Sequence, residues 1–186
     1  MIIGLTGRNA GGKGTVAAFF QENGFAYTSL SDAIRTYLAQ QGLPPTRDQM
    51  IATGRQLRQE GGPGVLAAKT LETMAPGADC IVDSVRNPAE VAELRKRSDF
   101  ILLDVQAGEH TRYQRLRERA RAGDAVTFEE FQRQELAELQ SGDTAAQQLL
   151  ATADLADIVV PNDGDIGDLH VFLEDLLVRL RKRFPD

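Results

Sequence analysis

A glycine-rich segment near the start of the chain has the residue types and spacing of a phosphate-binding loop. Glycines occupy four of the eight positions from 7 to 14, and a lysine stands among them. Glycine lets the backbone curl so that successive amide N–H groups point at phosphate oxygens, and lysine adds a mobile positive charge. A glycine-rich turn without a ligand would not need this register with the lysine. We assign to the loop Gly7, Asn9, Ala10, Gly11, Gly12, Lys13, Gly14 and Thr15.

The residue after Lys13 departs from the usual spelling of such a loop, which has serine or threonine there. This chain has Gly14 at that position and Thr15 one step later. The shift argues against direct magnesium coordination by Thr15, although we keep it as a candidate ligand. Asp83 closes a short apolar run. At the end of a strand beside the loop, its carboxylate can hold magnesium through water.

Two arginines follow the second and third apolar runs of the chain. Arg35 falls about one turn into the helix expected after residue 31, and Arg86 lies just past Asp83. Each planar guanidinium offers paired donors that match a phosphate group. We therefore expect Arg35 and Arg86 to bind a phosphorylated acceptor molecule.

The densest basic run of the chain covers residues 112–121. Within it Arg112, Arg115 and Arg119 share one helical face by the i, i+3, i+7 rule. Such a face can cover a phosphoryl group in transfer and neutralise its charge. The alternative is a solvated helix surface, but like charges four residues apart repel unless an anion lies between them. We assign Arg115 and Arg119 to the site.

Two other classes of nucleotide-binding protein lack support in the sequence. A GTPase needs a base-reading N-K-x-D segment, and the chain contains none. A hydrolytic ATPase usually carries a glutamate after the aspartate at the strand end, whereas Asp83 is followed by Ser84. In place of these features the chain has a set of basic residues suited to a phosphorylated acceptor.

Short apolar runs alternate with longer helix-patterned stretches, which is typical of a parallel sheet covered by helices on both faces. The pattern predicts a single domain over residues 1–186 with α/β fold class: a P-loop three-layer sandwich with a five-stranded parallel sheet. The expected strands are Ile2–Thr6, Phe25–Thr28, Cys80–Asp83, Phe100–Val105 and Asp157–Pro161.

Two gaps between expected strands exceed what a plain crossover needs. We predict a helical acceptor-binding insertion at about 30–78 and a lid at about 108–145. The sequence also marks helix starts: residues 46–49 and 127–130 fit the capping box, and residues 87–90 combine a cap, a proline and a glutamate.

Composition limits the partners. The formal net charge of −6 argues against broad nucleic-acid binding, which needs a basic surface. No apolar run is long enough to span a bilayer, and residues 1–5 are too short for the core of a signal peptide. We therefore expect a cytoplasmic protein without a membrane partner. The single Cys80 is expected in the core, and His110 and His170 at the surface.

With these residues assembled, the chain resembles the P-loop nucleotide kinases over nearly its whole length. It looks closest to the adenylate-kinase-like proteins of archaea and shares features with dephospho-coenzyme A kinase. The segments that carry the resemblance are residues 3–7, 12–15, 31–35, 83–88, 115–119 and 153–164. Ser84 stands where the archaeal group usually has glycine.

The resemblance implies transfer of the ATP γ-phosphoryl group to a nucleotide-like acceptor, with Mg²⁺ as cofactor. Lys13 would hold the outer phosphates, and Arg115 and Arg119 would close over the transfer. The loop after the last strand, with Asn162 and Gly164, would contact the adenine of ATP. Asp32 would either orient an acceptor hydroxyl or cap its own helix, and the sequence leaves both open.

Three functions remain in competition at this point. The first is a kinase of a nucleoside or deoxynucleoside monophosphate, which a phosphate bound by Arg35 and Arg86 favours. The second is dephospho-coenzyme A kinase, whose acceptor is a ribose hydroxyl. The third is a nucleotide-binding regulator that has lost phosphoryl transfer. The sequence does not indicate the oligomeric state.

Overall fold

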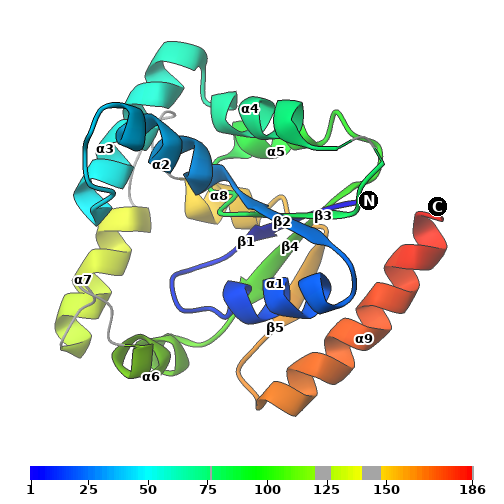
Figure 1. The fold of residues 1–186 in the computed structure, drawn as a ribbon. Coiled ribbons are helices and arrows are strands. Elements are labelled where there is room, and N and C mark those ends of the chain that lie inside the picture. The colour runs from blue at the N-terminus through cyan, green and yellow to red at the C-terminus, as the bar shows by residue number, and fades with distance from the viewer. Residues whose placement is uncertain (76, 120–126, 140–147, 186) are drawn as a thin grey trace.

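Five parallel strands form one sheet in the order β2-β3-β1-β4-β5 (Figure 1). The computed structural model describes residues 1–75, 77–119, 127–139 and 148–185. The strand β1 lies in the centre and pairs with β3 on one side and β4 on the other. The strands are β1 Ile2–Thr6, β2 Ala26–Ser29, β3 Cys80–Asp83, β4 Phe100–Gln106 and β5 Ile158–Pro161.

The sequence prediction of a five-stranded parallel sheet with helices on both faces is confirmed. Two strands have the expected bounds, two differ by one residue at one end, and β2 is shifted by one residue at both ends. The second strand begins at Ala26, where pairing with β3 begins, and the preceding Phe25 is 4% exposed and packs against Phe20 in the core. All five strands are parallel, so their carboxyl ends meet at one edge of the sheet.

Helices cover both faces of the sheet and bury a separate apolar core on each. The core under α1 and α9 contains Leu5, Phe20 and Leu173, and the core on the opposite face contains Ile2, Leu38 and Leu102. Figure 1 shows α1 and α9 on one side of the sheet and α4 and α5 on the other. The bounds are α1 Lys13–Glu22, α4 Val65–Thr73, α5 Pro88–Leu94, α8 Leu149–Ala153 and α9 Ile166–Arg183.

The remaining helices lie toward the edge of the sheet where the strands end (Figure 1). Helices α2 and α3 fall within the expected acceptor insertion, and α6 and α7 fall within the expected lid. Residues 120–126 and 140–145 of the lid, including Arg121, lie outside the described residues. The bounds are α2 Leu30–Gln40, α3 Arg47–Gly61, α6 Glu109–Arg119 and α7 Phe128–Leu139.

The expected helix starts are present in the structure. Thr127 and Glu130 form both hydrogen bonds of a capping box, each at 3.2 Å. The Thr46 hydroxyl accepts from the Gln49 amide at 3.3 Å, and the Asn87 side chain accepts from the Ala89 amide at 2.9 Å. Local side-chain chemistry therefore sets where these helices begin. No helix within the described ranges is long and apolar enough to cross a membrane.

Candidate phosphate site and acceptor cavity

The segment between β1 and α1 curls tightly because three of its residues have positive φ angles. These are Gly7 at 127°, Ala10 at 58° and Gly12 at 102°. An added Cβ at Gly7 would collide with the Val105 carbonyl oxygen, so the close approach of the loop to β4 needs glycine there. The loop leads directly into α1, whose N-terminus adds a favourable dipole for an anion.

The ammonium group of Lys13 lies inside the curve of the loop. Its Nζ donates hydrogen bonds to the carbonyl oxygens of Gly7 at 2.7 Å and Arg8 at 2.9 Å. These contacts hold the charge against the loop. A phosphate bound by the loop would lie within reach of this ammonium group.

A cavity of about 850 Å³ opens above the loop. Residues 9–15 form one wall, and Asp83, Arg115 and Arg119 are among the others. Its charged lining comprises Lys13, Arg35, Arg86, Arg115, Arg119, Asp83 and Glu118. Cations outnumber carboxylates five to two there, although the whole chain has a formal charge of −6. The cavity therefore attracts a polyanion.

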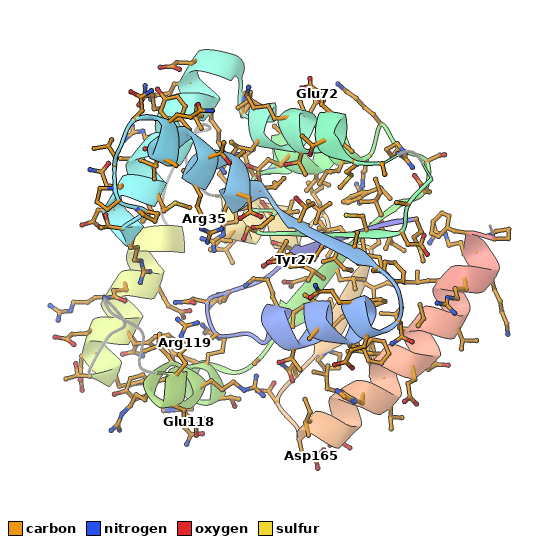
Figure 2. The ribbon with its side chains drawn as sticks, in the orientation of Figure 1. Tyr27, Arg35, Glu72, Glu118, Arg119 and Asp165 are labelled. Atoms are coloured by element: carbon orange, nitrogen blue, oxygen red, sulfur yellow. The ribbon has the colours of Figure 1, made fainter. Side chains whose placement is uncertain are left out.

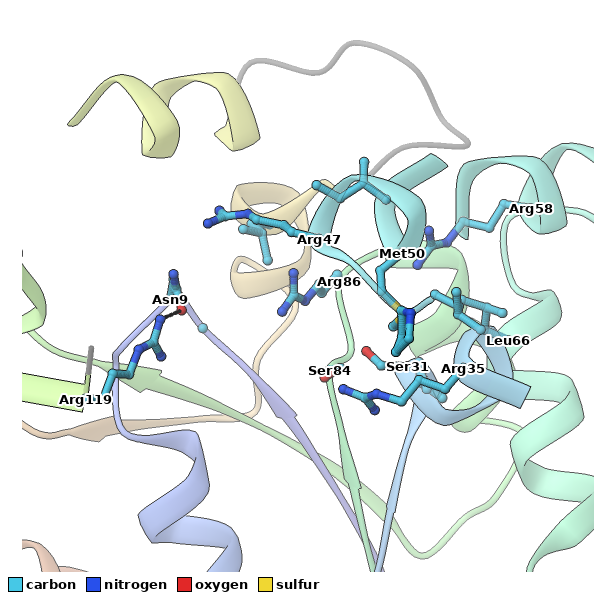
Figure 3. Close-up of a pocket in the computed structure, with 16 residues that line it drawn as sticks. Asn9, Ser31, Arg35, Arg47, Met50, Arg58, Leu66, Ser84, Arg86 and Arg119 are labelled. Atoms are coloured by element: carbon cyan, nitrogen blue, oxygen red, sulfur yellow. Dashed lines mark hydrogen bonds between the residues drawn. The ribbon is translucent and has the colours of Figure 1, made fainter. Parts of the chain in front are cut away.

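Arg115 and Arg119 both reach from α6 to the phosphate loop. Arg119 Nη2 donates to the Asn9 side chain at 3.1 Å (Figure 3). The Arg115 guanidinium lies next to Gly12, where an added Cβ would be 3.7 Å from Nη1. That nitrogen is buried and has no hydrogen-bond partner among the described residues. A buried unpaired donor is unfavourable, so an oxygen of a phosphate chain fits this position.

Asn162 lies beneath the loop, not on its open side. Its Nδ2 donates to the Gly11 carbonyl at 2.8 Å, and its backbone amide donates to Gln106 at 2.8 Å. The side chain thus supports the shape of the phosphate loop. Gly164 adjoins Asp168, near the start of α9, and is not among the described residues that line the cavity above the loop. Contact of either residue with adenine stays a prediction.

The β3 terminus presents Asp83 to the cavity in a fixed orientation. Asp83 Oδ1 accepts from the Ser84 amide at 2.6 Å, and Oδ2 accepts from the Tyr27 hydroxyl at 3.0 Å. Ser84 has φ 64°, a left-handed conformation that favours glycine. Burial, followed by the Asp83 carboxylate, raises the pKa of Tyr27 to about 12.

Asp83 and Thr15 line the same cavity, as the sequence led us to expect of a magnesium site. Within the described ranges there is no group of three or more His, Cys, Asp or Glu side chains that could hold a metal alone. Magnesium in nucleotide enzymes commonly takes one or two protein ligands together with phosphate oxygens and water. This donor set fits that arrangement.

A second cavity, of about 380 Å³, adjoins the first and is the candidate acceptor cavity. The phosphate loop contributes Gly7 and Asn9 to its lining, and Ser84 borders it too (Figure 3). Five arginines line it: Arg35, Arg47, Arg58, Arg86 and Arg119. Among the described residues, no aspartate, glutamate or histidine lines it. The remaining lining is mainly apolar: Leu30, Ile34, Pro45, Met50, Ile51, Leu66 and Leu149.

The structure brings Arg35 and Arg86 to this acceptor cavity but places Asp32 elsewhere. Asp32 Oδ2 accepts from the Ser29 amide at 3.2 Å and completes the capping box of α2. Its Oδ1 accepts from Arg35 Nη1 at 2.7 Å. Asp32 lines a separate hollow between α2, α3 and α4. Of the two roles left open by the sequence, the helix cap is therefore the one with observed contacts.

A buried ion pair beneath the acceptor cavity was not anticipated from the sequence. Arg58 Nε and Nη2 donate to Glu90 Oε1 at 3.0 and 2.6 Å, and Glu90 Oε2 accepts from the Arg86 amide at 2.8 Å. Glu90 is 0% and Arg58 5% exposed. Burial raises the pKa of Glu90, and the Arg58 guanidinium opposes that shift. Because arginine keeps its proton, the pair balances charge inside the protein.

A second buried pair joins the two described helices of the expected lid. Arg112 on α6 makes a two-pronged contact with Glu135 on α7, and Arg112 Nε donates to the Ala107 carbonyl at 2.9 Å. The phosphate-loop residue Arg8 lies 3.6 Å from the same carboxylate. Arg112 is 2% exposed. It therefore ties helices together, and of the three arginines on its face only Arg115 and Arg119 line the phosphate cavity.

Comparisons with known proteins give the family of the chain. A family model described as an AAA domain matches residues 3–137. A UPF0200 protein of Pyrococcus abyssi is 33% identical, over 98% of this chain and 96% of its own length. The chain belongs to the UPF0200 family. A UPF0200 protein of Methanoculleus marisnigri is 32% identical over 98% of both chains.

Solved structures share the fold of this UPF0200 chain at low sequence identity. Shikimate kinase from Bacteroides thetaiotaomicron has a TM-score of 0.60 and 14% identity, with 97% of this chain and 98% of that chain covered. A gluconokinase from Sinorhizobium meliloti has a TM-score of 0.56 and 15% identity, with 97% and 93% covered. The P-loop kinase-like fold is thereby confirmed. The closer resemblance to adenylate kinases or dephospho-coenzyme A kinase stays a prediction.

Proposed function

We propose that this UPF0200 protein is an ATP-dependent kinase that transfers the γ-phosphoryl group to a nucleoside or deoxynucleoside monophosphate. The phosphate cavity would take ATP, and the arginine-lined acceptor cavity beside it would take the monophosphate. The two cavities share Asn9, Arg35, Arg86 and Arg119, so bound phosphates would meet at these residues.

One observation carries the proposal: the acceptor cavity has five arginines and no acidic side chain among its described lining residues. Although Glu90 neutralises Arg58, the other arginines of the lining give the cavity a surplus of positive charge, which favours an anionic ligand. A phosphate monoester supplies that charge. Its oxygen is already a nucleophile, so the protein needs to position it and neutralise charge more than to remove a proton.

A hydroxyl acceptor fits the site less well, which weakens the dephospho-coenzyme A alternative. Kinases acting on hydroxyl groups typically place an aspartate where it accepts the hydroxyl proton. Asp32 was the candidate for that role, and both of its oxygens are engaged in the α2 cap and the Arg35 contact. It also lines a different hollow.

The assigned residues would divide the work as follows. Lys13 and the loop amides would hold the outer phosphates of ATP, and Asp83 with Thr15 would bind Mg²⁺ directly or through water. When bound, the metal supplies charge neutralisation between the phosphates. Arg115 would satisfy its buried Nη1 on a phosphate oxygen. The guanidinium groups that line both cavities would then stabilise charge on the transferring group.

An assay of ADP release tests the proposal directly. Purified protein with MgATP would be supplied in turn with nucleoside monophosphates, deoxynucleoside monophosphates and dephospho-coenzyme A. The proposal predicts that at least one monophosphate stimulates ADP release and that dephospho-coenzyme A does not. Stimulation by dephospho-coenzyme A alone would support the rival kinase. ATP binding without release for any acceptor would support a regulator.

Substitution Arg86→Ala separates the acceptor role from ATP binding. Loss of a charge-assisted hydrogen bond contributes roughly 1.5–3 kcal/mol, so the acceptor KM should rise or kcat should fall by about 10- to 100-fold. The Kd for ATP should change little. Arg179→Ala on the outer face of α9 is the matched control, since its partner is the exposed Asp175. A loss of ATP affinity alone would reassign Arg86 to the nucleotide.

A further inference from the structure

The acceptor cavity has two chemically different ends. Asn9 and Arg119 mark the end at the phosphate loop, and Arg58 and Leu66 lie at the opposite end, with Arg86 between them (Figure 3). Phosphoryl transfer requires the acceptor phosphate to lie beside the loop. The far end must then receive the part of the acceptor most distant from its phosphate.

Apolar side chains line the end of the acceptor cavity that lies away from the phosphate loop, and they suit a flat ring. Leu66 is 0%, Leu30 1% and Ile34 6% exposed, and all three line the cavity together with Met50. Burying a planar heterocycle between such side chains is favourable, since it removes apolar surface from water on both. In a nucleoside monophosphate this ring is the base.

Arg58 supplies polar recognition at that end. Its Nε and Nη2 are taken by Glu90, whereas Nη1 donates to no partner among the described residues. Both Nη1 and Ile34 Cδ1 approach Gly54, since an added Cβ there would lie 3.2 Å from Nη1 and 3.0 Å from Cδ1. Nη1 therefore lies close to Ile34, and Arg58 and Ile34 both line the cavity.

The Glu90 carboxylate changes what Arg58 can recognise. The ion pair of Arg58 with Glu90 carries no net charge, so Arg58 is poorly suited to bind a second anion. The N–H groups of Arg58 that do not contact Glu90 can only donate hydrogen bonds, because arginine has no acceptor atom. A base edge facing them must offer hydrogen-bond acceptors. The outer edge of a base is the one that faces the major groove in DNA. There guanine carries two acceptors, O6 and N7, and thymine or uracil carries O4, whereas adenine carries N7 beside an amino donor and cytosine carries an amino donor.

We propose that Arg58 is a specificity-determining residue that selects acceptors with an oxo group on the outer edge of the base. Guanine, uracil and thymine monophosphates would be preferred over their amino counterparts, adenine and cytosine. The inference rests on the proposed function, because it assumes a nucleoside monophosphate in the acceptor cavity. Glu90 is a positioning residue, since it orients Arg58 and accepts from the backbone amide of Arg86.

Two matched pairs of acceptors test the proposal in the unmodified protein. IMP against AMP, and UMP against CMP, change an oxo group for an amino group while the rest of the ring stays the same, and GMP adds a 2-amino group to the oxo purine. A well-formed base contact discriminates by about 1–3 kcal/mol, so kcat/KM should favour the oxo member about 10-fold or more in each pair. Equal values, or a preference for AMP and CMP, would overturn the assignment of Arg58.

The double substitution R58M/E90Q tests whether Arg58 is the cause. It removes both charges together, which avoids an unpaired buried ion, and glutamine keeps an oxygen for the Arg86 amide. The proposal predicts that the oxo-to-amino ratio falls to within about 2-fold. Circular dichroism and thermal unfolding check the fold. A folded variant with the full preference retained would contradict the role of Arg58.

Calorimetric binding of GMP and AMP to the unmodified protein gives a second measurement if the variant does not fold. A lower Kd for GMP by about 10-fold supports the inference, and equal Kd values overturn it. Different results would contradict the proposed kinase function and the proposed base preference. If no monophosphate stimulates ADP release, the proposed function fails; if AMP is the best acceptor, the proposed function stands and only the base preference fails.

Discussion

Lys13 combines a charge with a position that the backbone fixes. Its Nζ is held 2.7 and 2.9 Å from two loop carbonyls, so the ammonium group stays where outer phosphates would bind. We predict that Lys13→Ala lowers turnover by at least about 100-fold, because a preorganised charge of this kind is worth several kcal/mol in the transition state. Initial rates of ADP release measure the effect.

The matched control for Lys13 is Lys96→Ala. Lys96 is an exposed lysine just after α5, and its partner Glu93 lies in the last turn of that helix, far along the chain from the loop. It should leave turnover unchanged. Both variants should keep the circular dichroism spectrum of the unmodified protein. Wild-type turnover by a folded Lys13→Ala protein would remove the phosphate-loop assignment.

Tyr27 provides a spectroscopic probe of Asp83. Burial is the main cause that raises the pKa of Tyr27 to about 12, and the Asp83 carboxylate adds to it. We predict that Asp83→Asn lowers this pKa but leaves it above 10, because burial remains. Absorbance titration of the phenolate, with Tyr27→Phe to identify the transition, measures it. An unchanged pKa would mean that Asp83 does not face the Tyr27 hydroxyl.

The raised pKa of Tyr27 makes the stability of the fold depend on pH in the alkaline range. The folded pKa of Tyr27 lies above the ordinary value near 10, so the neutral phenol is favoured by folding. Its contribution to stability is fully present below pH 10 and is lost as the pH rises through about 12. At neutral pH the Tyr27 hydroxyl therefore remains a donor that orients Asp83.

At the scale of elements, the contact between α6 and α7 positions the arginines that face the phosphate loop. Arg112 is 2% exposed and its charge is balanced by Glu135. We predict that Glu135→Gln lowers the free energy of unfolding by about 3 kcal/mol, because removal of one partner leaves a buried charge uncompensated. Urea denaturation measures the change.

Arg133→Gln, an exposed position on the same helix, is the control for Glu135. It should change the free energy of unfolding by less than about 0.5 kcal/mol. Hydrogen exchange should show faster exchange in α7 for Glu135→Gln than for the control. Equal unfolding free energies in the two variants would show that the Arg112–Glu135 contact does not hold the helices together.

Local sequence was enough to predict the sheet and the phosphate loop. Each strand is an apolar run that ends at polar or glycine residues. The phosphate loop consists of consecutive residues from Gly7 to Thr15. Caps at Thr46, Asn87 and Thr127 were visible for the same reason. These features depend on neighbours within a few positions.

Contacts between distant segments could not be predicted in this way. Arg58 and Glu90 are 32 residues apart and Arg112 and Glu135 are 23 apart, so no spacing rule links them. The helix α8 has five residues, too few for a periodic pattern. Asp32 had a catalytic interpretation only because the sequence does not show where its side chain points.

At the scale of the whole molecule, charge is segregated. The chain has a formal net charge of −6, yet most of the charged residues that line the two cavities at the carboxyl ends of the strands are arginine or lysine. Figure 2 shows Arg35 and Arg119 directed toward the space between the helices at this edge of the molecule. The parallel sheet places the loop, Asp83 and the acceptor arginines at one edge because its strands all end there.

The central claim is that two adjoining cavities hold a nucleotide triphosphate and an acceptor monophosphate side by side. Isothermal titration calorimetry with adenosine linked through five phosphates to a second nucleoside tests it, using each of the four common bases in turn. Linking two ligands that bind adjacent sites should strengthen binding strongly. The account predicts that the best linked compound binds at least about 100-fold more tightly than ATP, and equal affinity for both would contradict it.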